Sequence, residues 1–325
     1  MTAVVAHLGG QHALRLAENL HAGGMLQCLA TGVVFRSPPR WMHVTAVKGV
    51  RARYSPALRG ARSIMMPYLA LADFAARKLI PAEWRLSASH GVLHSFDRLV
   101  AKRLENIGGR VIVAYENSAL NTFQAARELG MVCVLDAASV HYRSQQFHGL
   151  DRNQSEVLNR INAWKHRELE LADVVITASR FARDSYVKGG VAPHKMRIVP
   201  MGVDCESFFP GATGKVSDEM TFLFAGSISA GKGVDVLCSA FAEMGDRKAK
   251  LRLAGPCVDP SMLQHLKGTA VEYIGELSPL RLAEEYRRAD VFVLPSRFDG
   301  YGMAVLEAMA SARSEERRVG KECRL

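Results

Sequence analysis

A strand that runs through a loop into a helix is the clearest pattern in this sequence. Residues 291–296 (VFVLPS) are an apolar run of strand length, and residues 299–310 (DGYGMAVLEAMA) place strong helix formers at helical spacing. In an open α/β sheet, ligands bind beyond the carboxyl ends of the strands, where helix N-termini offer unpaired N–H groups to anions. Gly300 and Gly302 would let the backbone approach such a ligand closely. The pattern therefore predicts a ligand site at the edge of a sheet.

Two carboxylates lie within this pattern. Asp299 stands on the loop, and Glu307 follows eight positions later, about two turns into the helix at 3.6 residues per turn. Both can contribute to a ligand site. Glu307 can equally be a solvated helix residue, because acidic side chains are mostly exposed, so the spacing alone leaves both interpretations open.

The N-terminal half alternates between strand-like and helix-like segments. Its first strand, residues 2–8, meets a helix at 12–21 through the turn Gly9-Gly10, which resembles a phosphate-binding turn but lacks the full GxGxxG pattern. The pattern predicts further strands at 27–34, 110–114, 131–135, 174–179 and 197–199, and helices within 55–80 and at 96–106, 121–129, 153–171 and 180–187. Strands and helices that alternate at this spacing indicate a parallel sheet.

Polar residues follow the strand at 131–135. Asp136, His141 and Tyr142 come where the loops of such a sheet meet ligands. His141 could contact a ligand, or it could be a hydrogen-bonded surface histidine.

The alternation restarts after a connection rich in turn residues, including Pro200, Gly202 and Pro210. We place a domain boundary there. The predicted strands that follow are 220–224, 251–254, 271–274 and 291–294, and the predicted helices are 234–244 and 279–289. Residues 226–233 (GSISAGKG) precede a helix, so their N–H groups and Lys232 can bind a diphosphate. The spacing is not that of a Walker loop, and a tight turn with an exposed lysine is the alternative.

In this order the motifs resemble glycosyltransferase family 4. IVPMGVDCESFFP (198–210) resembles the linker between the family's domains, FLFAGSISAGKGVDVL (222–237) its diphosphate loop, VEYIGELSPLRLAEEYRRADVFVLPS (271–296) the segment before the donor site, and DGYGMAVLEAMA the donor signature. The resemblance is specific over residues 172–310 and general over the N-terminal half. It implies the α/β fold called GT-B, with two Rossmann-like doubly wound domains that face a cleft.

The resemblance also implies roles for individual residues. Glu307 matches the second acidic residue of the family's EX7E motif, which holds the ribose hydroxyls of the donor, and Asp299 stands at the first position, usually Glu, which faces the donor sugar. Lys232 matches the lysine that binds the diphosphate, whereas Ser227 stands where the family often has arginine. The implied catalytic residues are Asp299, Glu307 and His141, the histidine facing the donor sugar, and the implied donor-binding residues are Gly226, Ser227, Lys232, Gly233, Gly300, Tyr301, Gly302, Gly9 and Gly10.

The implied enzyme is a retaining glycosyltransferase that moves a sugar from a nucleotide-diphosphate donor to a glycan or lipid-linked acceptor in cell-surface polysaccharide synthesis. Asp299 and Glu307 position the donor, without a covalent intermediate. No metal or other cofactor is expected, because lysine and the helix dipole meet the charge of the diphosphate. The alternative is a non-catalytic nucleotide-sugar-binding or scaffold protein on the same fold, which Asp299 and the missing arginine favour. A dinucleotide oxidoreductase is less well supported, because no GxGxxG is present.

The domain limits expected from this interpretation are 1–204 for an acceptor-side domain and 205–312 for a donor domain. From Arg313 the composition changes to RSEERRVGKECR, which resembles a translated sequencing adapter. We therefore expect residues 313–325 to be non-native and the donor domain to be truncated, which predicts poor stability and weak activity. A solvated helical tail is the alternative.

Charge is unevenly distributed along the chain, whose formal net charge is +10. Between Arg36 and Arg85 there are ten basic and two acidic residues, interspersed with aromatic and aliphatic ones. Such mixed surfaces attract anionic membranes or anionic substrates. Nucleic acid is a weaker candidate because no reading motif accompanies the charge, and a solvated basic face is the alternative.

We expect a cytoplasmic protein, peripheral on the inner face of the plasma membrane. No run approaches the roughly 20 apolar residues of a membrane span, and the N-terminal residues lack a basic leader. The six cysteines are scattered singly, so neither a zinc site nor a disulfide framework is indicated.

Overall fold

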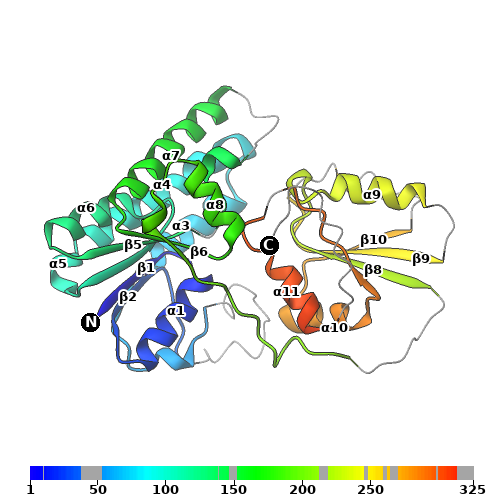
Figure 1. Ribbon diagram of the computed structural model, residues 1–325, viewed down its shortest axis with the longest axis horizontal. Coiled ribbons are helices and arrows are strands. Elements are labelled where there is room, and N and C mark those ends of the chain that lie inside the picture. Colours follow the sequence, from blue (N-terminus) through cyan, green and yellow to red (C-terminus); the bar gives the residue numbers. More distant parts are fainter. Residues whose placement is uncertain are drawn as a thin grey trace. The chain divides into compact units, whose positions relative to one another are not determined.

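The computed structural model describes residues 1–9, 11–37, 53–137, 139–145, 152–211, 219–244, 248–258, 262–263, 270–297 and 299–312. The chain divides into two compact units, Met1–Val199 and the part from Pro200 onward, and Figure 1 shows helices around a sheet in each. Predictions about Gly10, residues 38–52 and the segment from Arg313 lie outside the described residues.

The described residues of the first unit form a sheet of seven parallel strands in the order β3-β2-β1-β4-β5-β6-β7. Its strands are β1 (Ala3–His7), β2 (Leu26–Thr31), β3 (Ser63–Met65), β4 (Val111–Tyr115), β5 (Val132–Asp136), β6 (Val174–Thr177) and β7 (Met196–Ile198). The strand order reverses between β1 and β4, the kind of position at which doubly wound sheets bind ligands.

Helices cover both faces of this sheet (Figure 1). They are α1 (Gln11–Ala22), α3 (Pro67–Lys78), α4 (Ala82–Ala101), α5 (Leu104–Ile107), α6 (Leu120–Glu128), α7 (Arg152–Leu171) and α8 (Arg180–Lys188), with 3-10 turns η2 (Pro56–Leu58), η3 (Tyr142–Ser144) and η4 (Pro193–Lys195). Successive strand residues point to opposite faces. Val4 accordingly packs with Phe96 of α4, while Val5 packs with Leu14 of α1.

The second unit has, within its described residues, four parallel strands in the order β10-β9-β8-β11. The elements are β8 (Met220–Ala225), η5 (Ala230–Lys232), α9 (Val234–Glu243), β9 (Ala249–Ala254), β10 (Val271–Gly275), α10 (Pro279–Arg288), β11 (Val291–Phe292) and α11 (Met303–Ala310). Here the strand order reverses between β8 and β11. Phe224 packs with Phe241 of α9 on one face, and Leu223 packs with Tyr286 of α10 on the other.

The α/β fold class is confirmed, and most predicted elements lie within two residues of the observed ones. The main errors fall between residues 55 and 106. The sequence predicted a helix at 96–106, whereas α4 begins at Ala82 and ends at Ala101. Residues 82–95 include Gly91 and lack a clear apolar period, but contacts of α4 with α3, α6 and α7 stabilise the helix despite the weak propensity. The three-residue strand β3 is too short to produce a period.

None of the described helices combines the length and apolar character that crossing a bilayer requires. The thiols of Cys28, Cys133 and Cys238 are free and buried, whereas that of Cys205 is free and exposed.

Candidate functional site

Two loops meet at the carboxyl edge of the second sheet, where its strand order reverses. The loop at 226–233 follows β8, and the loop that contains Pro295 and Arg297 follows β11. Gly233 has a φ of +70°, and a Cβ there would overlap the carbonyl oxygen of Pro295. The Arg297 guanidinium forms an ion pair with Asp235 of α9 at 2.7 Å. The two loops are therefore in close contact at Gly233, where the backbone leaves no room for a side chain.

Lys232 and Asp299 meet at this junction. The Lys232 Nζ lies 2.6 Å from Asp299 Oδ2, and both side chains are less than one-third exposed, at 28% and 29%. Asp299 Oδ1 accepts hydrogen bonds from the backbone N–H groups of Tyr301 at 3.3 Å and Gly302 at 3.0 Å. Gly302, with a φ of 74°, is the N-cap of α11. A lysine and a helix N-terminus thus surround one carboxylate, and the same groups can bind a phosphate.

Glu307 lies further along α11 and is held by a different residue. Its Oε2 is 3.0 Å from the hydroxyl of Tyr286, a side chain of α10 that is fully buried. Burial raises the pKa of Glu307, and the hydrogen bond from Tyr286 opposes that shift. The structure therefore brings Lys232 and Asp299 together, while Glu307 lies against α10.

The remaining predicted donor-binding residues line the same loops. Gly226 donates its N–H to Ala254 at 2.9 Å, and its carbonyl lies where a Cβ on Gly255 would be. Ser227 is partly exposed beside it. Gly300 is buried between Asp299 and Tyr301, and the Tyr301 hydroxyl donates to the carbonyl of Met201 at 2.7 Å.

Ser296 was not predicted as a site residue. Its Oγ is buried within the loop that follows β11, and it has no hydrogen-bond partner among the described residues. A polar residue that closes an apolar strand run is the signal that could have identified it.

The first unit places a row of titratable side chains where its own strand order reverses. His7, Tyr115 and Asp136 are the last residues of β1, β4 and β5. The rings of His7 and Tyr115 lie 4.4 Å apart, and Tyr115 is the register partner of Asp136. Burial raises the pKa of Asp136 to about 6. His7 Nδ1 lies 2.9 Å from the carbonyl oxygen of Gly9, the described member of the predicted glycine turn.

His141 lies elsewhere in this unit and is only 1% exposed. Its ring packs 4.2 Å from that of Tyr142 and 5.2 Å from that of Tyr186 on α8, and it fills the space where a Cβ on Gly189 would be. Burial lowers the pKa of His141 to about 4, so the ring is neutral at neutral pH. The contact of His141 with a donor sugar stays a prediction.

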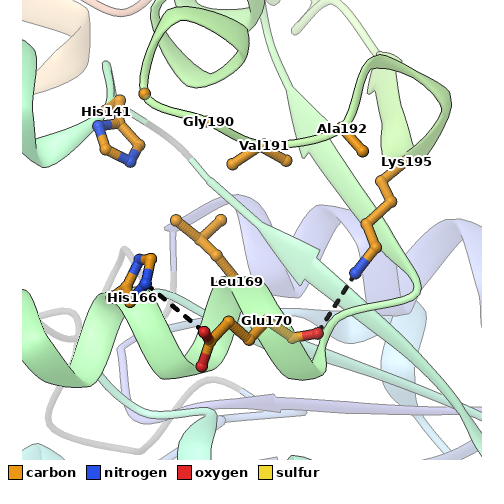
Figure 2. Close-up of a pocket in the computed structure, with 9 residues that line it drawn as sticks. His141, His166, Leu169, Glu170, Gly190, Val191, Ala192 and Lys195 are labelled. Atoms are coloured by element: carbon orange, nitrogen blue, oxygen red, sulfur yellow. Dashed lines mark hydrogen bonds and ion pairs between the residues drawn. The ribbon is translucent and has the colours of Figure 1, made fainter.

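A pocket of about 300 Å³ adjoins His141. Figure 2 shows the rings of His141 and His166 on facing sides of it, with Val191 beside them, and the His166 Nε2 lies 3.5 Å from the Glu170 carboxylate. The Lys195 ammonium donates to the Glu170 carbonyl at 3.3 Å. Within the described parts of the chain, no three His, Cys, Asp or Glu side chains are arranged to hold a metal ion, and the absence of a cofactor stays a prediction.

Two family models match the chain. One is described as Glycosyltransferase Family 4 and matches residues 10–207; the other is described as Glycosyl transferases group 1 and matches residues 219–314. The D-inositol 3-phosphate glycosyltransferase of Acidothermus cellulolyticus is 28% identical over 169 residues, 43% of this chain and 38% of that protein. The mannosylfructose-phosphate synthase of Agrobacterium fabrum is 29% identical over 168 residues, 43% of this chain and 36% of that protein. The chain thus spans little more than a third of the length of these curated relatives.

Solved structures share the fold over nearly the whole chain. Sucrose-phosphate synthase from Thermosynechococcus elongatus superposes with a TM-score of 0.65 at 21% identity, covering 96% of this chain and 80% of that one. HepE from Anabaena, in complex with UDP-glucose, gives a TM-score of 0.59 at 12% identity, covering 96% of this chain and 79% of that one. At such identities the likeness concerns the fold alone, and it supports the predicted pair of Rossmann-like units.

Proposed function

The chain belongs to glycosyltransferase family 4, and from this premise we propose that it transfers a sugar from a nucleoside-diphosphate donor to an acceptor hydroxyl with retention of anomeric configuration. The observation that carries the proposal is the anion site at the edge of the second sheet, where Lys232 and the N-terminus of α11 surround the Asp299 carboxylate. A donor diphosphate has the charge that these groups bind.

The diphosphate of the donor would replace the Asp299 carboxylate as the partner of Lys232 and the backbone N–H groups. The diphosphate takes the Lys232 ammonium and the N–H groups of Tyr301 and Gly302, which donate to Asp299 in the structure. Asp299 turns to the sugar, and Glu307 holds the ribose hydroxyls. During transfer the bond from the anomeric carbon to the diphosphate oxygen breaks, a bond to the acceptor oxygen forms, and the proton of the acceptor hydroxyl passes to the departing diphosphate. Lys232 and the helix dipole stabilise the charge on the departing diphosphate, so the proposal requires no metal.

The acceptor is proposed to bind the first unit. The row of His7, Tyr115 and Asp136 supports this, because it lies at the carboxyl edge where the strand order of that sheet reverses. We propose a glycan or lipid-linked acceptor of cell-surface polysaccharide synthesis, with the reaction in the cytoplasm. UDP is the first nucleotide to test, because HepE was solved with UDP-glucose.

A second candidate is a protein that binds a nucleotide sugar without transferring it. Asp299 is shorter than the glutamate usual at this position, and Ser227 supplies no positive charge to a diphosphate. Both features favour binding over turnover.

A panel of UDP-, GDP- and ADP-sugars distinguishes these candidates. We expect release of the nucleoside diphosphate from one donor, unchanged by EDTA, and calorimetric binding of the same nucleotide. K232M should weaken that binding by about tenfold or more. The matched control K250M, at a lysine that pairs with Glu219 at 2.9 Å, should not. Binding without release would favour the second candidate, and nucleotide binding that K232M leaves intact would contradict the proposed site.

A further inference from the structure

A row of large apolar side chains is exposed on α3 and the start of α4. Leu71 is 68% exposed, Phe74 58%, Leu79 75% and Trp84 56%, and Tyr68 is exposed beside them. We call these five residues the α3–α4 surface. Exposed apolar residues scattered singly are ordinary, but a contiguous set indicates a binding surface.

Helical spacing puts most of this surface on one side of α3. Tyr68, Leu71, Phe74 and Lys78 follow one another at intervals of three, three and four residues, so they share a face. The opposite face carries Leu69, Ala70 and Ala76, which are buried. The core therefore uses the inner face of α3, and the outer face leaves Tyr68, Leu71 and Phe74 exposed.

Basic and acidic side chains both lie along α3 and the start of α4. From Tyr68 to Leu86 the chain has three basic residues, Arg77, Lys78 and Arg85, and two acidic ones, Asp73 and Glu83. The Arg77 guanidinium is paired with Asp73 at 3.0 Å, whereas Lys78 and Arg85 are exposed at the end of α3 and the start of α4. Long basic side chains can lie along apolar groups while the charged head stays in water. The surface thus combines exposed apolar side chains with two exposed cations, Lys78 and Arg85.

We propose that the α3–α4 surface docks on an anionic lipid bilayer. Tryptophan and tyrosine favour the interface between headgroups and acyl chains, and an apolar helix face flanked by lysine and arginine lies in that interface. Lys78 and Arg85 complement the negative charge of the lipids. The helix would lie on the membrane and would not cross it.

The position of α3 determines which edge of the first sheet lies near the docked surface. The helix follows directly on β3, and a Cβ on Gly32, just after β2, would lie 2.9 Å from the Ala70 Cβ. Asp73 and Arg77 also interact electrostatically with His7. The docked surface therefore adjoins the carboxyl edge of the first sheet, where a lipid-linked acceptor could be reached. Only this last link rests on the proposed transfer; the docking itself does not.

Flotation with vesicles tests the docking. The whole chain should float with vesicles of phosphatidylcholine and phosphatidylglycerol at low salt and should not float with phosphatidylcholine alone. L71S/F74S should reduce the bound fraction by more than about tenfold, and K78Q/R85Q should reduce it by a similar factor. The matched control L129S/L280S removes two leucines that are exposed elsewhere, at 44% and 60%, and should float like the unaltered chain.

Two further measurements exclude other occupants of the surface. Trp84 should shift to shorter emission wavelength with anionic vesicles, and W84F should lose that shift. Circular dichroism of L71S/F74S should match the unaltered chain, so that lost flotation is not lost folding. The proposal fails if the unaltered chain does not float, if L71S/F74S floats equally well, or if Trp84 is shielded from acrylamide without lipid. It also fails if the chain is a dimer that L71S/F74S dissociates, because a second copy then covers the surface.

Discussion

The contact between Lys232 and Asp299 predicts that removal of the Asp299 charge has opposite effects on two quantities. Nucleotide affinity should rise, and sugar transfer should fall. The Asp299 carboxylate occupies the lysine and the N–H groups that a diphosphate would use. D299N keeps the shape but removes the competing charge, so UDP should bind severalfold more tightly, in line with about 0.5–1 kcal/mol for a partly exposed ion pair. Turnover should fall if Asp299 contacts the sugar.

Titration calorimetry with UDP checks this prediction. D235N is the matched control, because Asp235 lies near the same sheet edge but pairs with Arg297. Weaker UDP binding by D299N would mean that the carboxylate shapes the loop more than it competes with phosphate.

The pair of Glu307 and Tyr286 predicts a pH dependence of nucleotide binding. Burial raises the pKa of Glu307, and the Tyr286 hydroxyl opposes this shift. A carboxylate must be ionised to accept hydrogen bonds from both ribose hydroxyls, so affinity should fall as the pH drops through this raised pKa. Y286F removes the opposing hydrogen bond, and the fall should then begin at a higher pH.

The dissociation constant of UDP between pH 5 and 8 measures this effect. E307Q cannot titrate and should bind weakly with no such fall. An identical pH profile in Y286F and the unaltered chain would show that another group controls binding.

At the scale of elements, the close approach of the loops after β8 and β11 predicts that a side chain at position 233 lowers the stability more than one at a comparable glycine. Gly233 and Gly275 both have a positive φ, 70° and 76°, so alanine at either position should cost about 1 kcal/mol. Only at Gly233 does a Cβ meet a neighbour, the Pro295 carbonyl, whereas nothing lies within 4 Å at Gly275. G233A should therefore destabilise by about 1–3 kcal/mol more than G275A.

Urea unfolding and UDP affinity measure the difference. G233A should lower both the unfolding midpoint and the affinity, because the displaced loop carries Lys232, whereas G275A should lower mainly the midpoint. Equal effects would indicate that the loops do not press together in solution.

The elements also show what the sequence could and could not predict. Strands such as 131–135 were predictable because their apolar runs are bounded by turn residues. Ligands of open α/β sheets bind beyond the carboxyl ends of the strands, and this rule predicted that Lys232 and Asp299 lie on loops there. In the structure the two side chains are in contact. Partners set by strand order and packing were not predictable. Tyr286 reaches Glu307 only because α10 packs beside α11, and His7 meets Tyr115 only because β1 and β4 are neighbours. The burial of His141 depends in the same way on Gly189, far along the chain.

At the scale of the whole molecule, each unit has its own core. Every apolar cluster among the described residues belongs to one unit: Val4 with Phe96 and Val5 with Leu14 in the first, and Phe224 with Phe241 in the second. Units with separate cores can unfold separately. A ligand that binds one of them should then stabilise that one alone.

The tryptophans make this separation measurable. All three, Trp41, Trp84 and Trp164, belong to the unit Met1–Val199, whereas Lys232 and Glu307 belong to the other. UDP at 100 times its dissociation constant stabilises the unit that binds it by about 2.7 kcal/mol. We therefore expect UDP to raise a calorimetric transition while the thermal transition seen by tryptophan fluorescence stays in place. At the same UDP concentration, K232M should reduce the calorimetric shift to about half or less, because its binding is about tenfold weaker or more. The contrary result would be an equal shift by UDP of the calorimetric transition and of the transition detected by tryptophan fluorescence. Coincident transitions of this kind indicate that the two units unfold as one cooperative body.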